Sequence, residues 1–237
     1  MDELIYEIKH KLFMRDCDTF QRIKPSAVLC MFQDCSEALT EGWGVGLGEM
    51  LSRDAIWVAA KVEAQATRLP LHAEEVTVRG WAKRSRSGIF PFHYEMLDTE
   101  GNELISGCSM WVLSSLKTHS MMSPDVPKIT LPTPEPDNAP LPRMRPIKGP
   151  EEKRRDTRRV RFTETDINGH LTNTRYMDWV CDLPDREFHR THPWKALRID
   201  YRAEIYPDED VVLDWACSDD GLWCESPGKF TAAIYYK

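Results

Sequence analysis

The sequence predicts an α+β protein made of two similar units, each with a central helix wrapped by an antiparallel sheet. Both halves begin with an alternating segment, continue through a short Asp-containing polar segment and then enter an apolar stretch of helical spacing. Runs of alternating polar and apolar residues follow each helix, as expected of half-buried strands. Residues 123–150 hold nine of the chain's 16 prolines, which excludes a long helix or a central strand there. We therefore expect domains at 1–122 and 151–237, joined by an extended linker at 123–150.

The first unit is predicted to contain one strand, one helix and four further strands. Ile5–Phe13 alternates like a strand, and Ser26–Leu39 has an apolar stripe of helical spacing. The later strands are expected at Ala55–Ala64, Glu75–Lys83, Phe90–Asp98 and Leu104–Leu113. Asp98 to Gly101 supplies a turn between the last two.

The second unit repeats this order. We expect a first strand at Arg158–Glu164 and a helix from about Asn173 to Leu183. Three further strands are expected at Leu197–Ile205, Val211–Ser218 and Phe230–Tyr236. In the most direct alignment of the two units, Asp16 and Asp18 match Asp166 and Asn168, and Phe20 matches His170. A helix wrapped by antiparallel strands, twice in one chain, predicts a tandem (double) hot-dog fold.

Composition narrows the functional classes. The chain is 41% hydrophobic and 29% charged, as in globular proteins, and its net charge of −7 argues against general nucleic-acid binding. It has no apolar run long enough to span a bilayer and no apolar leader near its start, so we expect a cytoplasmic protein without stable membrane association. Its seven cysteines form no CxxC pair, which favours reduced thiols and no zinc site.

Asp166, Asn168 and His170 are the residues that suggest chemistry. In an extended backbone, side chains at i, i+2 and i+4 project from one face, about 6–7 Å apart. A carboxylate, an amide and an imidazole would then lie just before a helix, whose free N–H groups polarise a carbonyl. Gly169 supplies backbone freedom between them. The same residue types are also ordinary turn and helix-capping residues, so composition alone leaves a structural role open.

The segment from Asp166 to Val180, DINGHLTNTRYMDWV, resembles the D-x-N-x-H-x-x-N segment of the acyl-acyl-carrier-protein thioesterases, the plant and bacterial enzymes that end fatty-acid synthesis. The likeness covers nearly the whole chain. It continues in Arg68–Pro70 with Glu75–Trp81, in Gly101–Leu113 and in Leu183–Phe188.

The resemblance implies a site made of Asp166, Asn168, His170 and a strand glutamate, which Glu204 matches. Alternation alone would place Glu204 on a solvent face. Ile205 stands where plant relatives have a cysteine, so a cysteine nucleophile is excluded there and a carboxylate mechanism remains. Either carboxylate could activate water or attack the thioester, and no cofactor is implied.

The resemblance also implies that the first unit houses the acyl chain. Asn173 is then a substrate-binding candidate, as are Trp57 and Trp81, and Trp43 and Trp111 could line or close the same tunnel. Each tryptophan could equally be an ordinary core or surface aromatic.

The implied substrate partner is an acyl carrier protein bearing a fatty acyl chain. A basic cluster in this acidic chain, formed by Lys153, Arg154, Arg155 and Arg158, could receive such an acidic partner, although charge runs are usually solvated surface. Two alternatives stay open: an acyl-CoA thioesterase, and an acyl-binding protein without catalysis. The sequence does not set the chain-length preference or decide between a monomer and a homodimer.

Overall fold

The computed structural model describes residues 4–118, 120–123, 129–136 and 149–237. Within these ranges ten strands form one antiparallel sheet in the order β1-β3-β4-β5-β2-β7-β10-β9-β8-β6. The first-half strands are β1 (Tyr6–Lys11), β2 (Ala55–Ala66), β3 (Glu75–Ala82), β4 (Phe90–Leu97) and β5 (Glu103–Ser115). The second-half strands are β6 (Arg154–Arg159), β7 (Ala196–Tyr201), β8 (Asp210–Cys217), β9 (Gly221–Ser226) and β10 (Phe230–Tyr235).

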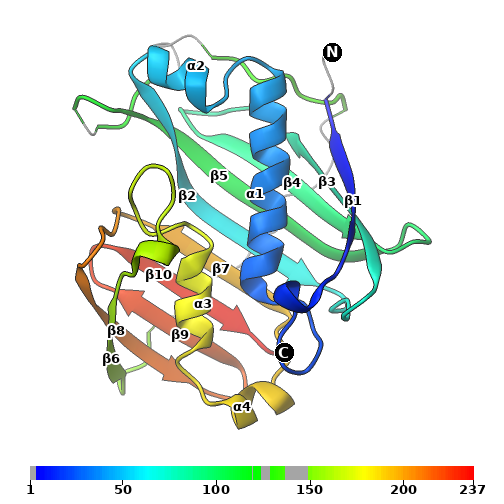
Figure 1. Cartoon of the computed structure of the whole chain (residues 1–237), viewed down its shortest axis with the longest axis vertical. Helices are drawn as coiled ribbons and strands as arrows, with labels where there is room; N and C mark the ends of the chain where they lie inside the picture. Colours follow the sequence, from blue (N-terminus) through cyan, green and yellow to red (C-terminus); the bar gives the residue numbers. More distant parts are fainter. Residues whose placement is uncertain (1–3, 119, 124–128, 137–148) are drawn as a thin grey trace.

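The two halves are joined within the sheet, because β2 pairs with β7 from Lys61 opposite Asp200 to Gln65 opposite Ala196. The helices are α1 (Pro25–Gly42), α2 (Leu47–Ser52), α3 (Arg175–Cys181) and α4 (Arg186–Thr191). The long helix α1 crosses the first-half strands, and the shorter α3 crosses the second-half strands on the same side of the sheet (Figure 1). Each half is therefore a helix against an antiparallel sheet, and this confirms the predicted α+β tandem hot-dog architecture.

Helix α1 supplies the core of the first half. Pro25 occupies its first turn, where a missing backbone N–H costs nothing. Val28, Phe32 and Leu39 recur at helical spacing and are almost completely buried. Phe32 stacks on Tyr94 of β4 at 4.6 Å between ring centroids. Burying one such side chain contributes about 1.5–3 kcal/mol, so packing rather than helix propensity fixes the position of α1.

Most predicted elements of the first half lie where the sequence places them, whereas three in the second half need correction. The strand predicted at Arg158–Glu164 is wrong: β6 ends at Arg159, and Phe162–Glu164 is a 3-10 helix. Val160 is buried but Phe162 is 90% exposed, so the two do not share a core face. The helix predicted at about 173–183 is only α3, and the strand predicted at 197–205 ends at Tyr201. Pattern analysis also missed α2, α4 and β9.

Much of the predicted linker at 123–150 lies outside the described residues, so the domain boundaries stay a prediction. In its described part, Ile129 and Leu131 are buried. Each of the seven cysteines is a free thiol. Among the described helices, none has the length and apolar character needed to cross a membrane.

Candidate active site

The segment that carries Asp166, Asn168 and His170 is a tight loop, not the extended backbone predicted. The Asp166 N–H donates to the His170 carbonyl at 2.9 Å, and the Gly169 N–H donates to the Asp166 carbonyl at 3.0 Å. The Asn168 N–H donates to Asp166 Oδ1 at 2.8 Å. This side-chain acceptor favours the turn over an extended strand. Gly169 has φ 78°, a left-handed conformation that glycine adopts without strain.

The loop brings His170 to Glu204. His170 Nε2 lies 3.5 Å from Glu204 Oε2, and their side chains are 22% and 38% exposed. Glu204 follows the end of β7, and the Leu171 N–H donates to the carbonyl of Ile205 at 2.8 Å. That backbone bond holds the Glu204 segment against the loop, so a residue that alternation placed on a solvent face becomes a neighbour of the imidazole.

Tyr206 completes this contact. Its hydroxyl donates to Glu204 Oε2 at 2.9 Å, and its ring meets the His170 ring edge-to-face at 4.8 Å. The hydrogen bond to Glu204 raises the pKa of Tyr206, so its proton stays in place to orient the carboxylate. Lys229 Nζ donates to the Glu204 carbonyl at 2.9 Å. Sequence reasoning missed both residues, because neither belongs to a motif.

A cavity of about 270 Å³ opens beside the loop, and we name it the 166–170 cavity. Its wall combines the loop of the second half with α1, α2, β2, β4 and β5 of the first half. The loop contributes Asp166, Ile167 and Asn168, and Asn173 lies on the same wall. The α1 side includes Gln33 and Glu37, which sequence reasoning also missed. Among the described residues, the His170–Glu204 pair is not part of this lining.

The predicted aromatic residues divide between the two faces of the sheet. Trp57 and Trp111 line the 166–170 cavity, and Trp57 Nε1 donates to the Val45 carbonyl at 2.8 Å. Trp81 does not line it. Its ring lies 4.6 Å from that of His93, because successive side chains along β3 alternate between the two sheet faces. The predicted contact of Trp81 with an acyl chain therefore has no support in this geometry.

The cavity narrows between α1 and the sheet. A small continuation of about 10 Å³ reaches Tyr94 and Ser109, with Trp111 on its wall. The Tyr94 hydroxyl and Ser109 Oγ lie 2.6 Å apart, and Trp111 Nε1 donates to Ser109 Oγ at 2.7 Å. Trp43 packs on Phe92, a lining residue, at 6.3 Å between ring centroids. The sheet side of this space is therefore mainly aromatic, whereas the α1 side also carries polar side chains such as Gln33 and Ser36.

Asn173 precedes α3, which begins at Arg175 and has only seven residues. Its carbonyl accepts a hydrogen bond from the Tyr201 hydroxyl at 2.8 Å. The backbone between the loop and α3 is therefore anchored to β7. Polarisation of a carbonyl by the start of this short helix stays a prediction.

The first half contains a loop of the same design. The Asp18 N–H donates to the Arg22 carbonyl at 2.7 Å, and the Gln21 N–H donates to the Asp18 carbonyl at 3.0 Å. The Phe20 N–H donates to Asp18 Oδ1 at 2.8 Å, and Gln21 has φ 68°. These bonds repeat, one for one, those of the loop at 166–170.

This correspondence corrects the predicted alignment of the two halves by two residues. The structurally equivalent pairs are Asp18 with Asp166, Phe20 with Asn168, Gln21 with Gly169, and Arg22 with His170. The first-half loop thus keeps the carboxylate that shapes the turn and replaces the amide and the imidazole. Its lack of the histidine, noted from the sequence, holds in the new alignment as well.

The predicted docking cluster lies on and beside β6, the outermost strand of the second half. Arg155 forms two hydrogen bonds with Asp214, at 2.8 and 3.2 Å, and Arg158 pairs with Asp182 at 3.3 Å. These two charges are largely neutralised within the chain. Lys153 and Arg154 lie over the rings of Trp223 and Trp215, at 4.6 and 5.0 Å, and neither has a carboxylate partner within the described part of the chain.

Two family models match the chain. The acyl-ACP thioesterase N-terminal domain matches residues 3–128, and the acyl-ACP thioesterase C-terminal domain matches residues 147–227. Together they cover both halves of the tandem.

Curated relatives and solved structures agree with these matches. A chloroplastic acyl-[acyl-carrier-protein] hydrolase of Cuphea viscosissima is 28% identical over 170 residues, covering 66% of this chain and 40% of the relative. A chloroplastic dodecanoyl-[acyl-carrier-protein] hydrolase of Cinnamomum camphora is 26% identical over 201 residues, covering 79% and 52%. The chain spans about half the length of these relatives.

Among solved structures, an acyl-ACP thioesterase from Bacteroides thetaiotaomicron superposes with a TM-score of 0.83 at 17% identity, covering 100% of both chains. The 12:0-ACP thioesterase from Umbellularia californica superposes with a TM-score of 0.81 at 17% identity, covering 99% of this chain and 97% of that one. These two structures share the fold. With the family models matched across both halves, the chain belongs to the acyl-ACP thioesterase family.

Proposed function

We propose that this protein hydrolyses fatty acyl thioesters carried on acyl carrier protein and releases the free fatty acid. The observation that carries the proposal is the 3.5 Å contact between His170 and Glu204. The loop that makes this contact also places Asp166 and Asn168 on the wall of a cavity that Trp57 and Phe92 line from the sheet. Hydrolysis of a thioester needs a base for water and a proton for the departing thiol, and these residue types can supply both. Family membership and the named activities of the relatives support the same reaction.

We assign the roles from where each side chain lies. The Asp166 carboxylate, at the cavity wall, takes a proton from the attacking water as the water oxygen bonds to the carbonyl carbon. Asn168, on the same wall, hydrogen-bonds the water or the carbonyl oxygen. His170, oriented by Glu204, returns a proton to the thiolate as the carbon–sulfur bond breaks. The acyl chain lies between α1 and the sheet, against Trp57.

The two carboxylates can be tested separately. Asp166→Asn and Glu204→Gln each keep size and shape while removing a base, and each is expected to lower kcat by at least about a hundredfold. The substrates are acyl-ACP thioesters from eight to eighteen carbons, with the released acids measured by mass spectrometry. Glu37→Gln, on the α1 side of the cavity, is the matched control and should retain most activity. An unchanged rate in either carboxylate variant removes that residue from the mechanism.

The carrier is tested by presenting one acyl chain on acyl carrier protein and on CoA. We expect a higher kcat/KM for the protein-borne chain, since Lys153 and Arg154 are available to an acidic partner. Equal kcat/KM on both carriers would favour a general acyl-CoA thioesterase. A folded protein that hydrolyses neither would favour acyl binding without catalysis.

A further inference from the structure

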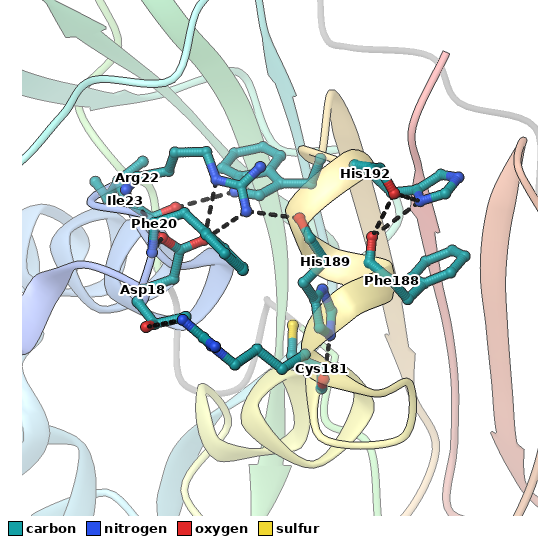
Figure 2. Close-up of polar contacts among 12 residues, drawn as sticks. Asp18, Phe20, Arg22, Ile23, Cys181, Phe188, His189 and His192 are labelled. Atoms are coloured by element: carbon teal, nitrogen blue, oxygen red, sulfur yellow. Dashed lines mark hydrogen bonds and ion pairs between the residues drawn. The ribbon is translucent and has the colours of Figure 1, made fainter.

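A second and larger cavity, of about 340 Å³, lies where the first-half loop meets the helices of the second half. We name it the 18–22 cavity after that loop. Figure 2 shows Asp18, Phe20 and Arg22 on one side of it, facing the segment that carries Cys181 and His189. Its volume lies within the range of small-molecule sites, about 300–1,000 Å³. Among the described residues, the two cavities share no lining residue.

Each of the two cavities lies between the loop of one half and the central helix of the other half. The 166–170 cavity combines the loop of the second half with the central helix α1 of the first half. The 18–22 cavity combines the equivalent loop of the first half with α3, the central helix of the second half, through Asp178 and Cys181, and Asp182 lines it just after the end of α3. The 18–22 cavity is therefore the counterpart of the proposed active site under the internal repeat.

This counterpart has lost the groups that the hydrolysis needs. Phe20 stands where the loop of the second half has Asn168, and Arg22 stands where it has His170. The Ile23 N–H donates to the Pro70 carbonyl at 3.0 Å, as the Leu171 N–H does to that of Ile205, so Leu69 takes the place of Glu204. The amide, the imidazole and the glutamate are all replaced. The cavity can therefore hold a ligand, but it has no equivalent of the His170–Glu204 pair to hydrolyse it.

The replaced residues are held rigidly. Arg22 Nε donates to Asp18 Oδ2 at 3.1 Å, and its terminal nitrogen donates to the His189 carbonyl at 2.7 Å. His189 Nε2 lies 2.7 Å from the Cys181 carbonyl oxygen (Figure 2). Trp194 Nε1 donates to the Ile23 carbonyl at 3.1 Å. The Arg22–His189 and Trp194–Ile23 bonds connect the loop of the first half to the second half, and the His189–Cys181 bond lies within the second half. The two sides of the cavity are therefore fixed to one another.

The charges around the cavity favour an anion. Its three carboxylates are already paired, Asp18 with Arg22, Asp178 with Arg175 and Asp182 with Arg158. The half-buried Lys24 and the exposed Arg186 have no carboxylate partner among the residues that the structure describes. Arg186 instead lies 5.4 Å from the Phe20 ring centroid. The cavity therefore has two cations free to meet an anion and no free carboxylate to repel it.

One buried polar group in the wall has no partner. Tyr236 is only 6% exposed, and its hydroxyl makes no hydrogen bond within the described part of the chain. Burial raises the pKa of Tyr236, so this hydroxyl is a donor at neutral pH. This hydroxyl oxygen has almost no accessible surface, so a ligand in the cavity meets the Tyr236 ring and not its oxygen. The wall also includes the apolar Trp194 and Ile234, together with His189 and His192.

We propose that the 18–22 cavity is a second, non-hydrolytic binding site for a carboxylate with an apolar tail, such as a short or medium-chain free fatty acid. The tail lies against Phe20, Trp194 and Ile234. Lys24 and Arg186 neutralise the carboxylate. This site is independent of the proposed hydrolysis, because binding requires none of the catalytic residues.

The test is calorimetric titration of the full chain with octanoate, with octanol (the same tail without charge) as the matched ligand. We expect octanoate to bind at least about tenfold more tightly than octanol, the effect of charge-assisted hydrogen bonds. The double variant Lys24→Gln/Arg186→Gln should lose at least about tenfold in octanoate affinity at this site. The control Lys153→Gln/Arg154→Gln, which removes two unpaired cations elsewhere, should bind like the wild type. No octanoate binding, or equal binding by all three proteins, overturns the proposal.

A second variant separates stability from binding. Tyr236→Phe removes the unpaired hydroxyl, so the melting temperature of the ligand-free protein should rise by about 2 °C or more. Because the hydroxyl does not reach the cavity, the same change should leave octanoate affinity unchanged. A loss of affinity as large as that of Lys24→Gln/Arg186→Gln would assign binding to the hydroxyl and overturns the role of the two cations. Hydrolysis of acyl-ACP should be unaffected in Lys24→Gln/Arg186→Gln and in Tyr236→Phe, which separates this proposal from the proposed function.

Discussion

Gly169 offers a direct test of the loop that holds the proposed catalytic residues. It has φ 78°, and a Cβ added there would meet no atom within 4 Å, so Gly169→Ala changes only the backbone energy. A left-handed conformation costs a residue with a Cβ about 1–2 kcal/mol. Alanine also lowers the conformational entropy of the unfolded chain, which stabilises the folded state by about 0.4–1 kcal/mol. The expected net loss is about 1 kcal/mol, or about 2–4 °C in melting temperature for a chain of this size.

The effect of Gly169→Ala on catalysis should exceed its effect on stability. The first-half loop holds Gln21 at φ 68° with its turn closed, so the turn of Gly169→Ala should stay closed while its backbone adjusts. A shift of about 1 Å in catalytic groups costs on the order of a hundredfold in rate, so even a small adjustment lowers kcat. We expect kcat on acyl-ACP to fall at least about tenfold while the folded protein persists. Calorimetry and steady-state hydrolysis measure the two effects on one preparation.

The internal repeat supplies a matched control. Gln21, at φ 68°, occupies the equivalent position of the first-half loop, so Gln21→Gly relieves strain there. It should leave kcat unchanged and raise the melting temperature slightly. If Gly169→Ala retained full kcat and melting temperature, or if Gln21→Gly reduced kcat as much as Gly169→Ala, the assignment of the 166–170 loop as the catalytic one would be refuted.

Three further predictions concern other parts of the molecule. Tyr206→Phe removes the hydroxyl that orients Glu204. We expect kcat to fall about tenfold and the pH profile of kcat to shift, with KM nearly unchanged. An identical pH profile would argue against the positioning role of Tyr206. Burial lowers the pKa of His93 below its usual 6.5. As the pH drops below about 6.5, the unfolded state therefore binds a proton that the folded state does not bind, and the free energy of unfolding should fall. His93→Gln should flatten this slope in denaturant titrations at several pH values, and an unchanged slope would assign it to other groups. Lys153→Glu with Arg154→Glu should raise KM for acyl-ACP but not for acyl-CoA, whereas equal losses on both would contradict a docking role.

Sequence pattern located the elements whose apolar residues recur with a regular period. Strand β3 buries every second residue and helix α1 buries residues at helical spacing, and period alone identifies both patterns. The pattern failed at Phe162, where an apolar residue continues the alternation of Val160 and yet is 90% exposed. Alternation reports which residues could share a face, and only the fold decides which of them are covered.

At the 166–170 loop, too, the sequence identified the residues and the fold decided their conformation. Residue identity was enough to single out Asp166, Asn168 and His170 as candidates. The extended conformation assumed for them is wrong, because the Asp166 side chain accepts a backbone N–H and closes a turn. The repeat was likewise detected from sequence but aligned two residues away. Asp16 and Asp18 match Asp166 equally well by residue type, and only the hydrogen bonds of the turn identify Asp18 as its equivalent.

The sequence by itself determined the fold class, the twofold repeat and the candidate residues of one loop, because these depend on local periodicity and on residue chemistry. Tertiary structure alone decided that Glu204 meets His170, that Trp57 faces a cavity while Trp81 does not, and that a second cavity lies between the first-half loop and α3. The physical reason is that each cavity combines residues from both halves of the chain. Such contacts arise only when the two halves pack on one continuous sheet, and no periodicity along the chain records them.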